Sequence, residues 1–432
     1  MQFFNVKTSE ELRDELYSLV KLLDSEIIGI ESALGRVLAT DVHSPVDLPD
    51  FNRSIMDGFA VRARDTFGAS ASSPAYLKVT GEVLMGETTT LKVSTGEAIK
   101  IATGGMLPDN ADAVVMVEDT DYEMTERSEN KVFAHHPTSS CSPDSQDEIL
   151  IEVTRTVAPG DNIVRIGEDV RKSQKILSKG HQLHPQDIGA LAGLGILEVE
   201  VYRQPTVAII PTGDEIIPPT ETPKPGQIRD INSYSLAGLV QQTGGIPIRF
   251  DLVPDNHTAL QASLREALGK SDIVLISGGS SVGTRDVTLD VIADIDSAKI
   301  LAHGVSIRPG KPVIAAVAKD KYIFGMPGNP VSAMVVFELF VKPLLQWLSG
   351  LQQPQWNIRS VNAKLSTNFS SDPGREDYVR VRLIETVDGL MAEPVLGKSA
   401  LISTMVKADG TVKIPIGVEG LEAGEEVKVL LF

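Results

Sequence analysis

Hydrophobic positions along the chain follow two different periods. Between Ser9 and Ser25, apolar residues recur at the three- and four-residue spacing of a helix with one face to bury, and Ser9 is placed to cap its start. From Ile28 onward the apolar runs shorten to strand length and are interrupted by turn residues. The pattern therefore predicts an N-terminal amphipathic helix followed by β-rich structure.

Prolines and a composition shift indicate a domain boundary near Asp47. Residues 74–133 alternate between short apolar runs and glycine turns, and Ala113–Val117 predicts a buried strand. Residues 136–148 are polar and rich in proline and serine, as in a linker or a long hairpin tip. These patterns predict an inserted, mostly β domain over 47–147, and a discontinuous β subdomain formed by 28–46 and 148–182.

From Pro185 the chain alternates between helical and strand patterns. Such a βαβ series predicts a three-layer α/β domain over 183–350, with right-handed crossovers. Residues 355–432 return to short strands and glycine turns, which predicts a C-terminal β-barrel or sandwich. The fold class is therefore α/β plus β, in several domains. The predicted helices are 185–194, 233–243, 258–268 and 331–348, and the predicted strands are 206–210, 246–253, 273–276, 313–316 and 322–324.

Composition is that of a soluble globular protein of two to four domains, with 432 residues, 42% hydrophobic and 23% charged. No apolar run approaches the ~18 residues that span a bilayer, and the charged N-terminal segment is unlike a secretion signal, so we expect a cytoplasmic location. The single cysteine, Cys141, excludes an internal disulfide and a thiolate metal cluster.

The net charge of −18 disfavours nucleic acid and anionic membrane as partners, because their phosphates would be repelled. An anionic ligand would therefore need specifically placed cations.

A glycine- and serine-rich loop follows the most apolar predicted strand. Strand 273–276 leads into Ser277–Gly283, which holds three glycines and three serines, and Asp286 comes next. Glycines let backbone N–H groups approach an anion, and the carboxyl end of a central strand is where open α/β sheets bind ligands. A tight strand-to-helix turn without a ligand is the alternative. The loop matches neither the G-x-G-x-x-G nor the Walker A pattern, which disfavours a common nucleotide enzyme.

Carboxylates stand just beyond several predicted strands of the α/β domain. Asp214, Asp230 and Asp286 lie in loops that converge on one edge of a doubly wound sheet. Carboxylates and hydroxyls without thiols suit Mg²⁺, which often bridges to substrate phosphates. The alternative for each aspartate alone is a helix cap.

Ordered motifs along the whole chain resemble the MoeA/gephyrin E-domain family, the molybdopterin molybdenumtransferases. They are SIMDGFAV at 54–61, ATGG at 102–105 with Pro108, GED at 167–169, TGDE at 212–215, DIN at 230–232, SGGSSVG at 277–283 with Asp286, RPGKP at 308–312 and MPGNPVS at 326–332.

The resemblance implies an L-shaped subunit of four subdomains, a homodimer, and an N-terminal helix within 1–27 that packs on the α/β domain. The implied reaction inserts molybdate into adenylylated molybdopterin, with Mg²⁺ assisting, and yields AMP and the molybdenum cofactor. A molybdopterin adenylyltransferase would be the upstream supplier.

The resemblance also implies roles for individual residues. Asp214 and Asp230 would hold the cation at the phosphoanhydride, while Asp57, Thr103 and Glu168 would come from other subdomains and reach the site across the dimer. For Asp57 and Glu168, an interdomain hydrogen bond is the alternative. The implied catalytic residues are Asp214, Asp230, Asp57 and Glu168. The implied substrate-binding residues are Thr103, Asn232, Ser277, Gly278, Gly279, Ser280, Ser281, Gly283, Asp286, Pro327, Gly328, Asn329 and Pro330.

A site that binds a tetrahedral dianion such as molybdate needs hydrogen-bond donors and positive charge. In the C-terminal segment, REDYVRVR at 375–382 and GKSALIST at 397–404 resemble barrel motifs of the family, with Arg380 and Ser399 as the closest matches. The implied molybdate-binding residues are Arg308, Lys311, Pro312, Ser332, Arg380 and Ser399. Many relatives have lysine at position 308, and Lys398 replaces a tighter glycine–serine pair. For Arg380 and Arg382, a solvated strand face is the alternative.

Two rival functions share parts of this pattern. One is a gephyrin-like scaffold, and the other is a molybdopterin adenylyltransferase or nucleotide hydrolase built on the same α/β domain. The sequence leaves the choice between molybdate and tungstate open.

Overall fold

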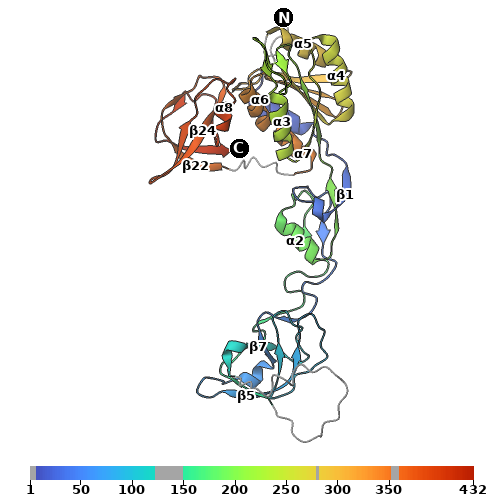
Figure 1. Ribbon diagram of the computed structural model, residues 1–432, viewed down its shortest axis with the longest axis vertical. Helices are drawn as coiled ribbons and strands as arrows, with labels where there is room; N and C mark the ends of the chain where they lie inside the picture. The colour runs from blue at the N-terminus through green and yellow to red at the C-terminus, as the bar shows by residue number, and fades with distance from the viewer. Residues whose placement is uncertain (1–5, 122–148, 279–281, 352–359) are drawn as a thin grey trace. The chain divides into compact units, whose positions relative to one another are not determined.

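The computed structural model describes residues 6–121, 149–278, 282–351 and 360–432, without the side chains of 282–286. The chain divides into two compact units, Met1–Thr40 with Ser178–Phe432, and Asp41–Leu177. The first unit contains the α/β domain, the C-terminal barrel and a small β piece (Figure 1). Cys141 lies outside the described residues.

A six-stranded sheet forms the centre of the α/β domain. Strand β17 (Ile273–Ser277) is buried along its whole length and runs parallel to both neighbours, which confirms the central strand predicted from its apolar run. The sheet is mixed, because β20 (Ile314–Ala318) is antiparallel to β21 (Lys321–Met326) and to β18 (Ala298–His303), which the sequence did not predict. Only two residues join β20 to β21, and so short a connection permits only antiparallel pairing. The order is β16 (Ile246–Arg249), β13 (Thr206–Pro211), β17, β21, β20, β18.

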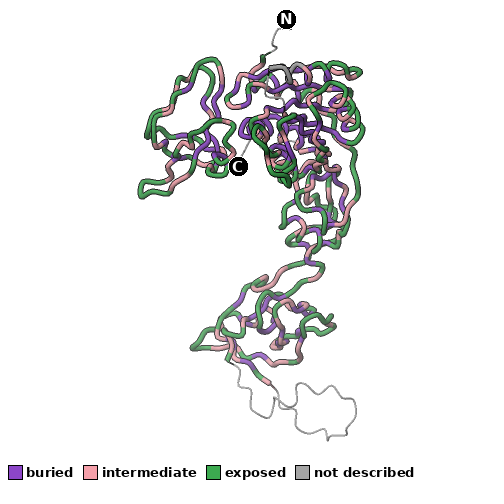
Figure 2. Tube along the Cα trace, turned by 45° about the horizontal axis from the view of Figure 1, so that its top comes forward, coloured by how far each residue is buried: buried purple, intermediate pink, exposed green. Residues whose placement is uncertain are grey.

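Helices cover both faces of this sheet, which confirms the predicted three layers (Figure 1). Figure 2 shows the buried positions inside this domain and the exposed ones on its outer loops. One face carries α1 (Ser9–Ser18), α3 (Asn232–Gln242), α6 (Pro330–Val336) and α7 (Lys342–Leu348), and the other carries α4 (His257–Lys270) and α5 (Val282–Ala293).

The predicted helix 331–348 contains a π-helical turn at Phe337–Val341, between α6 and α7. Its 19-residue stretch Pro330–Leu348 is long and apolar enough to cross a membrane, so the expectation that no apolar run has this length was wrong. However, 78% of the stretch is buried inside the structure, where it packs on the sheet. Its hydropathy is therefore that of a core helix.

Helix α1 begins and ends differently from the prediction. Thr8, not Ser9, caps it: the Thr8 hydroxyl accepts from Glu11 N and the Glu11 carboxylate accepts from Thr8 N. Ser9 instead donates to the buried Glu376 at 2.7 Å. The helix ends at Ser18. Beyond it, Leu19, Val20 and Leu23 pack on the same core without helical structure, whereas Leu22 is exposed.

The C-terminal segment forms a closed β-barrel, because β24 pairs with β25 and also with β26. Strand β19 (Ile307–Arg308) comes from the α/β segment but pairs in parallel with β24, which joins the two domains. The barrel strands are β22 (Ser360–Leu365), β24 (Glu376–Thr386), β25 (Gly389–Pro394), β26 (Gly410–Ile414) and β28 (Glu426–Leu431).

Two of the predicted domain boundaries move. Strand β9 (Leu150–Val153), which the prediction gave to the discontinuous subdomain, pairs with β5 (Ala75–Val83) in the sheet of the inserted domain. Strand β12 (Glu198–Tyr202) pairs with β1 (Ser25–Gly29) in the small β piece, so the α/β sheet begins only at β13. A local pattern predicts a strand but not which neighbour it joins. The inserted sheet also contains β4 (Gly58–Val61), β6 (Glu97–Ile101), β7 (Ala113–Met116) and β8 (Thr120–Asp121), and helix α2 spans Pro185–Gly193.

Candidate functional site

A cavity of about 1080 Å³ lies between the carboxyl edge of the α/β sheet and the barrel. All six residues predicted to bind molybdate line it. Five cationic and two anionic side chains are in its lining among the described residues, on a chain whose net charge is −18. The cavity therefore concentrates positive charge. Its charged residues are Arg308, Lys311, Arg375, Arg380, Lys398, Asp372 and Asp377.

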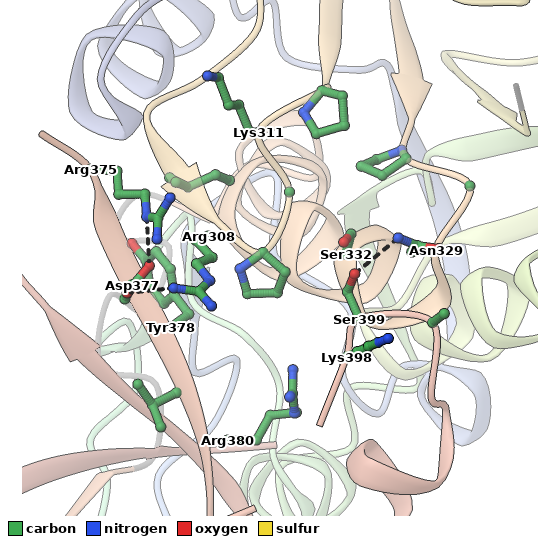
Figure 3. Close-up of a pocket in the computed structure, with 18 of the residues that line it drawn as sticks. Arg308, Lys311, Asn329, Ser332, Arg375, Asp377, Tyr378, Arg380, Lys398 and Ser399 are labelled. Carbon is green, nitrogen blue, oxygen red and sulfur yellow. Dashed lines mark hydrogen bonds and ion pairs between the residues drawn. The ribbon is translucent and has the colours of Figure 1, made fainter. Parts of the chain in front are cut away.

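The α/β wall of the cavity comes from the loop after β19 and from the start of α6. Arg308 ends β19, Lys311 lies in the loop that follows it, and Ser332 lies in the first turn of α6 and is buried. Asn329 Nδ2 donates to Ser399 Oγ at 2.9 Å, which ties this wall to the barrel (Figure 3). Arginine, lysine and hydroxyl donors are thus brought to one space, as binding of an oxyanion requires.

Arg380 lies on the barrel wall, and only 8% of it is exposed. Its Nη2 donates to Gly397 O at 2.8 Å, whereas its buried Nε has no hydrogen-bond partner among the described residues. Burial lowers the pKa of the Arg380 guanidinium. A buried donor without a partner suggests a ligand that accepts from it. The solvated strand face fits Arg382 instead, whose side chain is 56% exposed and pairs with Glu393 at 3.1 Å.

The sequence predicted no site role for three charged residues of this wall, Asp372, Arg375 and Asp377. Arg375 Nε lies 3.2 Å from Asp377 Oδ1, and Arg308 Nη1 lies 3.8 Å from Asp377 Oδ2. The motif at 375–382 contains Arg375 and Asp377, but only Arg380 was selected from it. Alternation along a strand would have placed Asp377 on the face opposite Arg380.

The carboxyl end of β17 makes an unusually close contact with the neighbouring loop. A Cβ at Gly278 would lie 1.8 Å from Thr212 O, so only glycine fits there. Ser277 Oγ and Asn232 Oδ1 are buried without hydrogen-bond partners among the described residues. Asn232 Nδ2 donates to Gly328 O at 3.0 Å, and both Gly278 and Gly328 line the cavity. These predicted substrate-binding residues thus meet at one edge of the sheet.

The two carboxylates predicted to hold Mg²⁺ are not in the cavity lining, but each is two residues from a residue of this edge: Asp214 follows Thr212 and Asp230 precedes Asn232. Asp214 Oδ1 accepts from Asp255 N at 3.2 Å, and burial together with Asp214 and Glu215 raises the pKa of the Asp255 carboxyl. Asp230 accepts from Ser233 N at 3.0 Å and from the Ser233 hydroxyl, so it caps the first turn of α3. Asp255 was missed, although it follows a predicted strand just as Asp214 does.

Among the described residues, no group of three or more histidine, cysteine or acidic side chains could hold a metal by itself. A Mg²⁺ ion usually uses only one or two protein carboxylates and completes its shell with water and phosphate. The crowding of Asp214, Glu215 and Asp255 is a repulsion that a cation would relieve. The residues present therefore fit a cation shared with a substrate phosphate.

Known families match the chain from end to end. Residues 7–195 match "MoeA N-terminal region (domain I and II)", residues 208–347 match "Probable molybdopterin binding domain", and residues 362–432 match "MoeA C-terminal region (domain IV)". A molybdopterin molybdenumtransferase of Nostoc sp. is 34% identical over 425 residues, which cover 96% of this chain and 91% of the relative. The chain belongs to the MoeA family.

Further members agree in sequence and structure. A molybdopterin molybdenumtransferase of Bacillus subtilis is 33% identical, with 94% of this chain and 90% of the relative covered. A crystal structure of a molybdopterin biosynthesis MoeA protein from Pyrococcus horikoshii OT3 is 34% identical and superposes with a TM-score of 0.81, covering 99% of this chain and 100% of that one. The family assignment predicted from the motifs is confirmed.

Three residues that the MoeA resemblance singled out belong to the second unit, which is described by itself. Asp57 accepts from Thr103 N at 2.7 Å and from Thr103 Oγ1 at 3.0 Å, and these hydrogen bonds lower the pKa of the Asp57 carboxyl. Glu168 accepts from Arg165 N at 2.8 Å. The structure thus brings Asp57 and Thr103 together. The catalytic role of Asp57 and Glu168 and the substrate-binding role of Thr103 stay predictions.

The remaining predicted residues divide by position. Pro327 lines the cavity, whereas Pro330 begins α6 beside it. Gly283 and Asp286 lie in α5, whose first side chains are outside the description. Gly279, Ser280 and Ser281 also lie outside the described residues.

Proposed function

We propose that this protein inserts molybdate into adenylylated molybdopterin, forming the molybdenum cofactor and releasing AMP. One observation carries the proposal: a cavity rich in positive charge, on an acidic chain of the MoeA family, contains every residue predicted to bind the oxyanion. The relatives named molybdopterin molybdenumtransferase support the transferase class and the pterin substrate.

The cavity residues have separable tasks in this reaction. Arg308, Lys311 and Arg380 attract and orient the dianion, and the hydroxyls of Ser332 and Ser399 bond its oxygens. The edge around Gly278 and the loop 327–329 receives the pterin phosphate, because close backbone approach is possible there. The two substrates would therefore meet within one cavity, which aligns the molybdenum with the pterin.

A Mg²⁺ ion, when bound, would neutralise charge on the phosphoanhydride as AMP leaves. Asp214 is the proposed ligand from the β13 loop, with Asp255 beside it. Asp230, which caps α3, is proposed as the second ligand.

We also propose a homodimer in which Asp57, Thr103 and Glu168 of one subunit complete the site of the other. A cytoplasmic location without nucleic-acid or membrane partners, and a molybdopterin adenylyltransferase as supplier, belong to the same proposal. Two variants that we expect to be inactive, Asp57→Ala and Asp230→Asn, test the shared site when they are unfolded and refolded together. Each mixed dimer would contain one intact site and one doubly altered site, so it should have about half of the activity of a wild-type dimer. No recovery would place Asp57 outside the partner's site.

The activity test uses purified protein, adenylylated molybdopterin, Mg²⁺ and molybdate, with AMP and the molybdenum cofactor as the measured products. AMP should form only when molybdate is present, and chelation of Mg²⁺ should abolish it. Omission of molybdate controls for simple hydrolysis. A parallel reaction with ATP and molybdopterin tests the adenylyltransferase alternative. AMP without molybdate, or adenylylation from ATP, would overturn the proposed insertion.

A further inference from the structure

Two arginines of the cavity, Arg308 from the α/β segment and Arg375 from the barrel segment, share a buried carboxylate. Arg308 and Asp377 are direct partners in the parallel pairing of β19 with β24. Only 2% of Asp377 is exposed, and its Oδ2 also accepts from Ser371 Oγ at 2.8 Å. Figure 3 shows Asp377 between Arg308 and Arg375, at 3.8 Å and 3.2 Å respectively. A carboxylate so buried needs these partners, because an unpaired buried charge is strongly disfavoured.

A second carboxylate holds the same two arginines from the solvent side. Asp372 forms an ion pair with Arg375, and its Oδ2 lies 3.8 Å from Arg308 Nη1. The side chain of Asp372 is 71% exposed, in contrast to 4% for Asp377. Each arginine is thus bridged by one buried and one exposed carboxylate. Both carboxylates also line the cavity.

These contacts have opposite consequences for an arriving anion. The Arg308 side chain is 57% exposed, so without Asp377 its long chain would sample many rotamers. Asp377 therefore fixes the direction in which both guanidiniums face. Asp372 lies where an oxyanion would meet the same N–H groups, and it is exposed enough to move away. A dianion attracts two guanidiniums more strongly than a single carboxylate does, and can displace it.

We propose that Arg308 and Arg375 form a clamp for a tetrahedral dianion, with Asp377 as the positioning residue that holds both arginines. Asp372 is a specificity-determining residue that occupies the clamp until a dianion replaces it, so that anions of single charge are excluded. This inference rests on the proposed function only for the identity of the anion as molybdate.

The test compares Asp377→Asn and Asp372→Asn by calorimetric titration with molybdate or sulfate alone, without the pterin. Each change removes one negative charge beside the same arginines, so Coulomb attraction alone would tighten anion binding in both. We expect Asp377→Asn instead to raise the dissociation constant about tenfold, because the arginines lose their alignment. Asp372→Asn should lower it roughly two- to fivefold, because an exposed competitor is removed. Formate as a probe of single charge should gain more from Asp372→Asn than sulfate does.

Two further measurements complete the test. Ser371→Ala leaves every charge in place and should raise the dissociation constant by a smaller factor than Asp377→Asn, so it decides the positioning role even if Asp377→Asn does not fold. In high salt the effect of Asp372→Asn should shrink, since exposed charges are screened, while that of the buried Asp377 remains.

Tighter binding in Asp377→Asn, or no change in Ser371→Ala, would overturn the positioning role. Unchanged or weaker binding in Asp372→Asn would overturn the competition. Failure of this inference can be told apart from failure of the proposed function, since the titrations contain no pterin and measure no AMP. Wild type that binds dianions as expected but releases no AMP would contradict only the proposed function.

Discussion

The close contact between Gly278 and Thr212 predicts that a side chain at position 278 will reduce activity, and the structure gives the size of the clash. In Gly278→Ala the new methyl group would start 1.8 Å from Thr212 O and 2.6 Å from Thr212 C, whereas real contacts of this kind exceed 3.0 Å. The new methyl group and the Thr212 carbonyl are both attached directly to the backbone, so neither can rotate away. The two loops must therefore separate by about 1 Å to restore a normal contact. The backbone at Gly278, with φ +152°, is also rarely adopted by other residues.

Strain of this kind is worth roughly 1–3 kcal/mol of folding free energy. The effect on the reaction should be larger in proportion, because a displacement of about 1 Å can reduce a rate by about a hundredfold. Gly278 lines the cavity, and Thr212 precedes Asp214 by two residues. The displacement would therefore separate the phosphate-binding edge from the proposed cation ligand.

The assay measures AMP release and urea unfolding for Gly278→Ala and for a matched control, Gly269→Ala. Gly269 lies in α4 with nothing within 4 Å of its virtual Cβ, so alanine there should stabilise the helix by roughly 0.5–1 kcal/mol and leave activity unchanged. Full activity in Gly278→Ala would refute the close-contact reasoning. An equal loss in both variants would show that the effect is not specific to the site.

Three other predictions address single residues. Asp230→Asn should keep the fold, because asparagine caps a helix as well as aspartate does, yet lose AMP release measured with Mg²⁺; full activity would remove Asp230 from the cation site. Lys311→Ala should raise the half-saturating molybdate concentration about ten- to a hundredfold while binding of adenylylated molybdopterin, measured by titration, stays nearly unchanged. Asp272 is buried, which raises its pKa, but hydrogen bonds from Arg203 and Thr206 outweigh burial and lower the pKa from 3.8 to about 2. Because the folded-state pKa is the lower one, these contacts stabilise the fold by about 2 kcal/mol above pH 4, and this stabilisation is lost as pH falls from about 4 to about 2. Urea unfolding followed by tryptophan fluorescence should show Asp272→Asn less stable at pH 7 and the difference shrinking toward pH 2; a difference independent of pH would contradict the ion pair.

The pattern of polar and apolar residues within short segments determined most of the helices and strands. The side chains within a segment also indicated what kind of ligand it could bind. The continuous apolar run at 273–276 predicted a strand covered on both faces, and β17 is that strand. Motif residues such as Arg308, Lys311 and Ser332 were predicted to act together, and they line one cavity. The strand follows from a short-range rule, since period and polarity can be seen within a few residues. The joint role of the three motif residues followed from the resemblance to the family.

Tertiary structure alone decided which distant segments meet. Strand β19 pairs with β24 although Arg308 and Asp377 are far apart in sequence, and this pairing brings Asp377 beneath Arg308. The same is true of β9, whose partner lies in the inserted sheet, and of the short contact between Gly278 and Thr212. A strand presents the same backbone donors and acceptors to any neighbour, so its own residues do not specify the partner. Which strands pair is decided by burial of the whole core. The charged wall of the cavity results from one such pairing, that of β19 with β24.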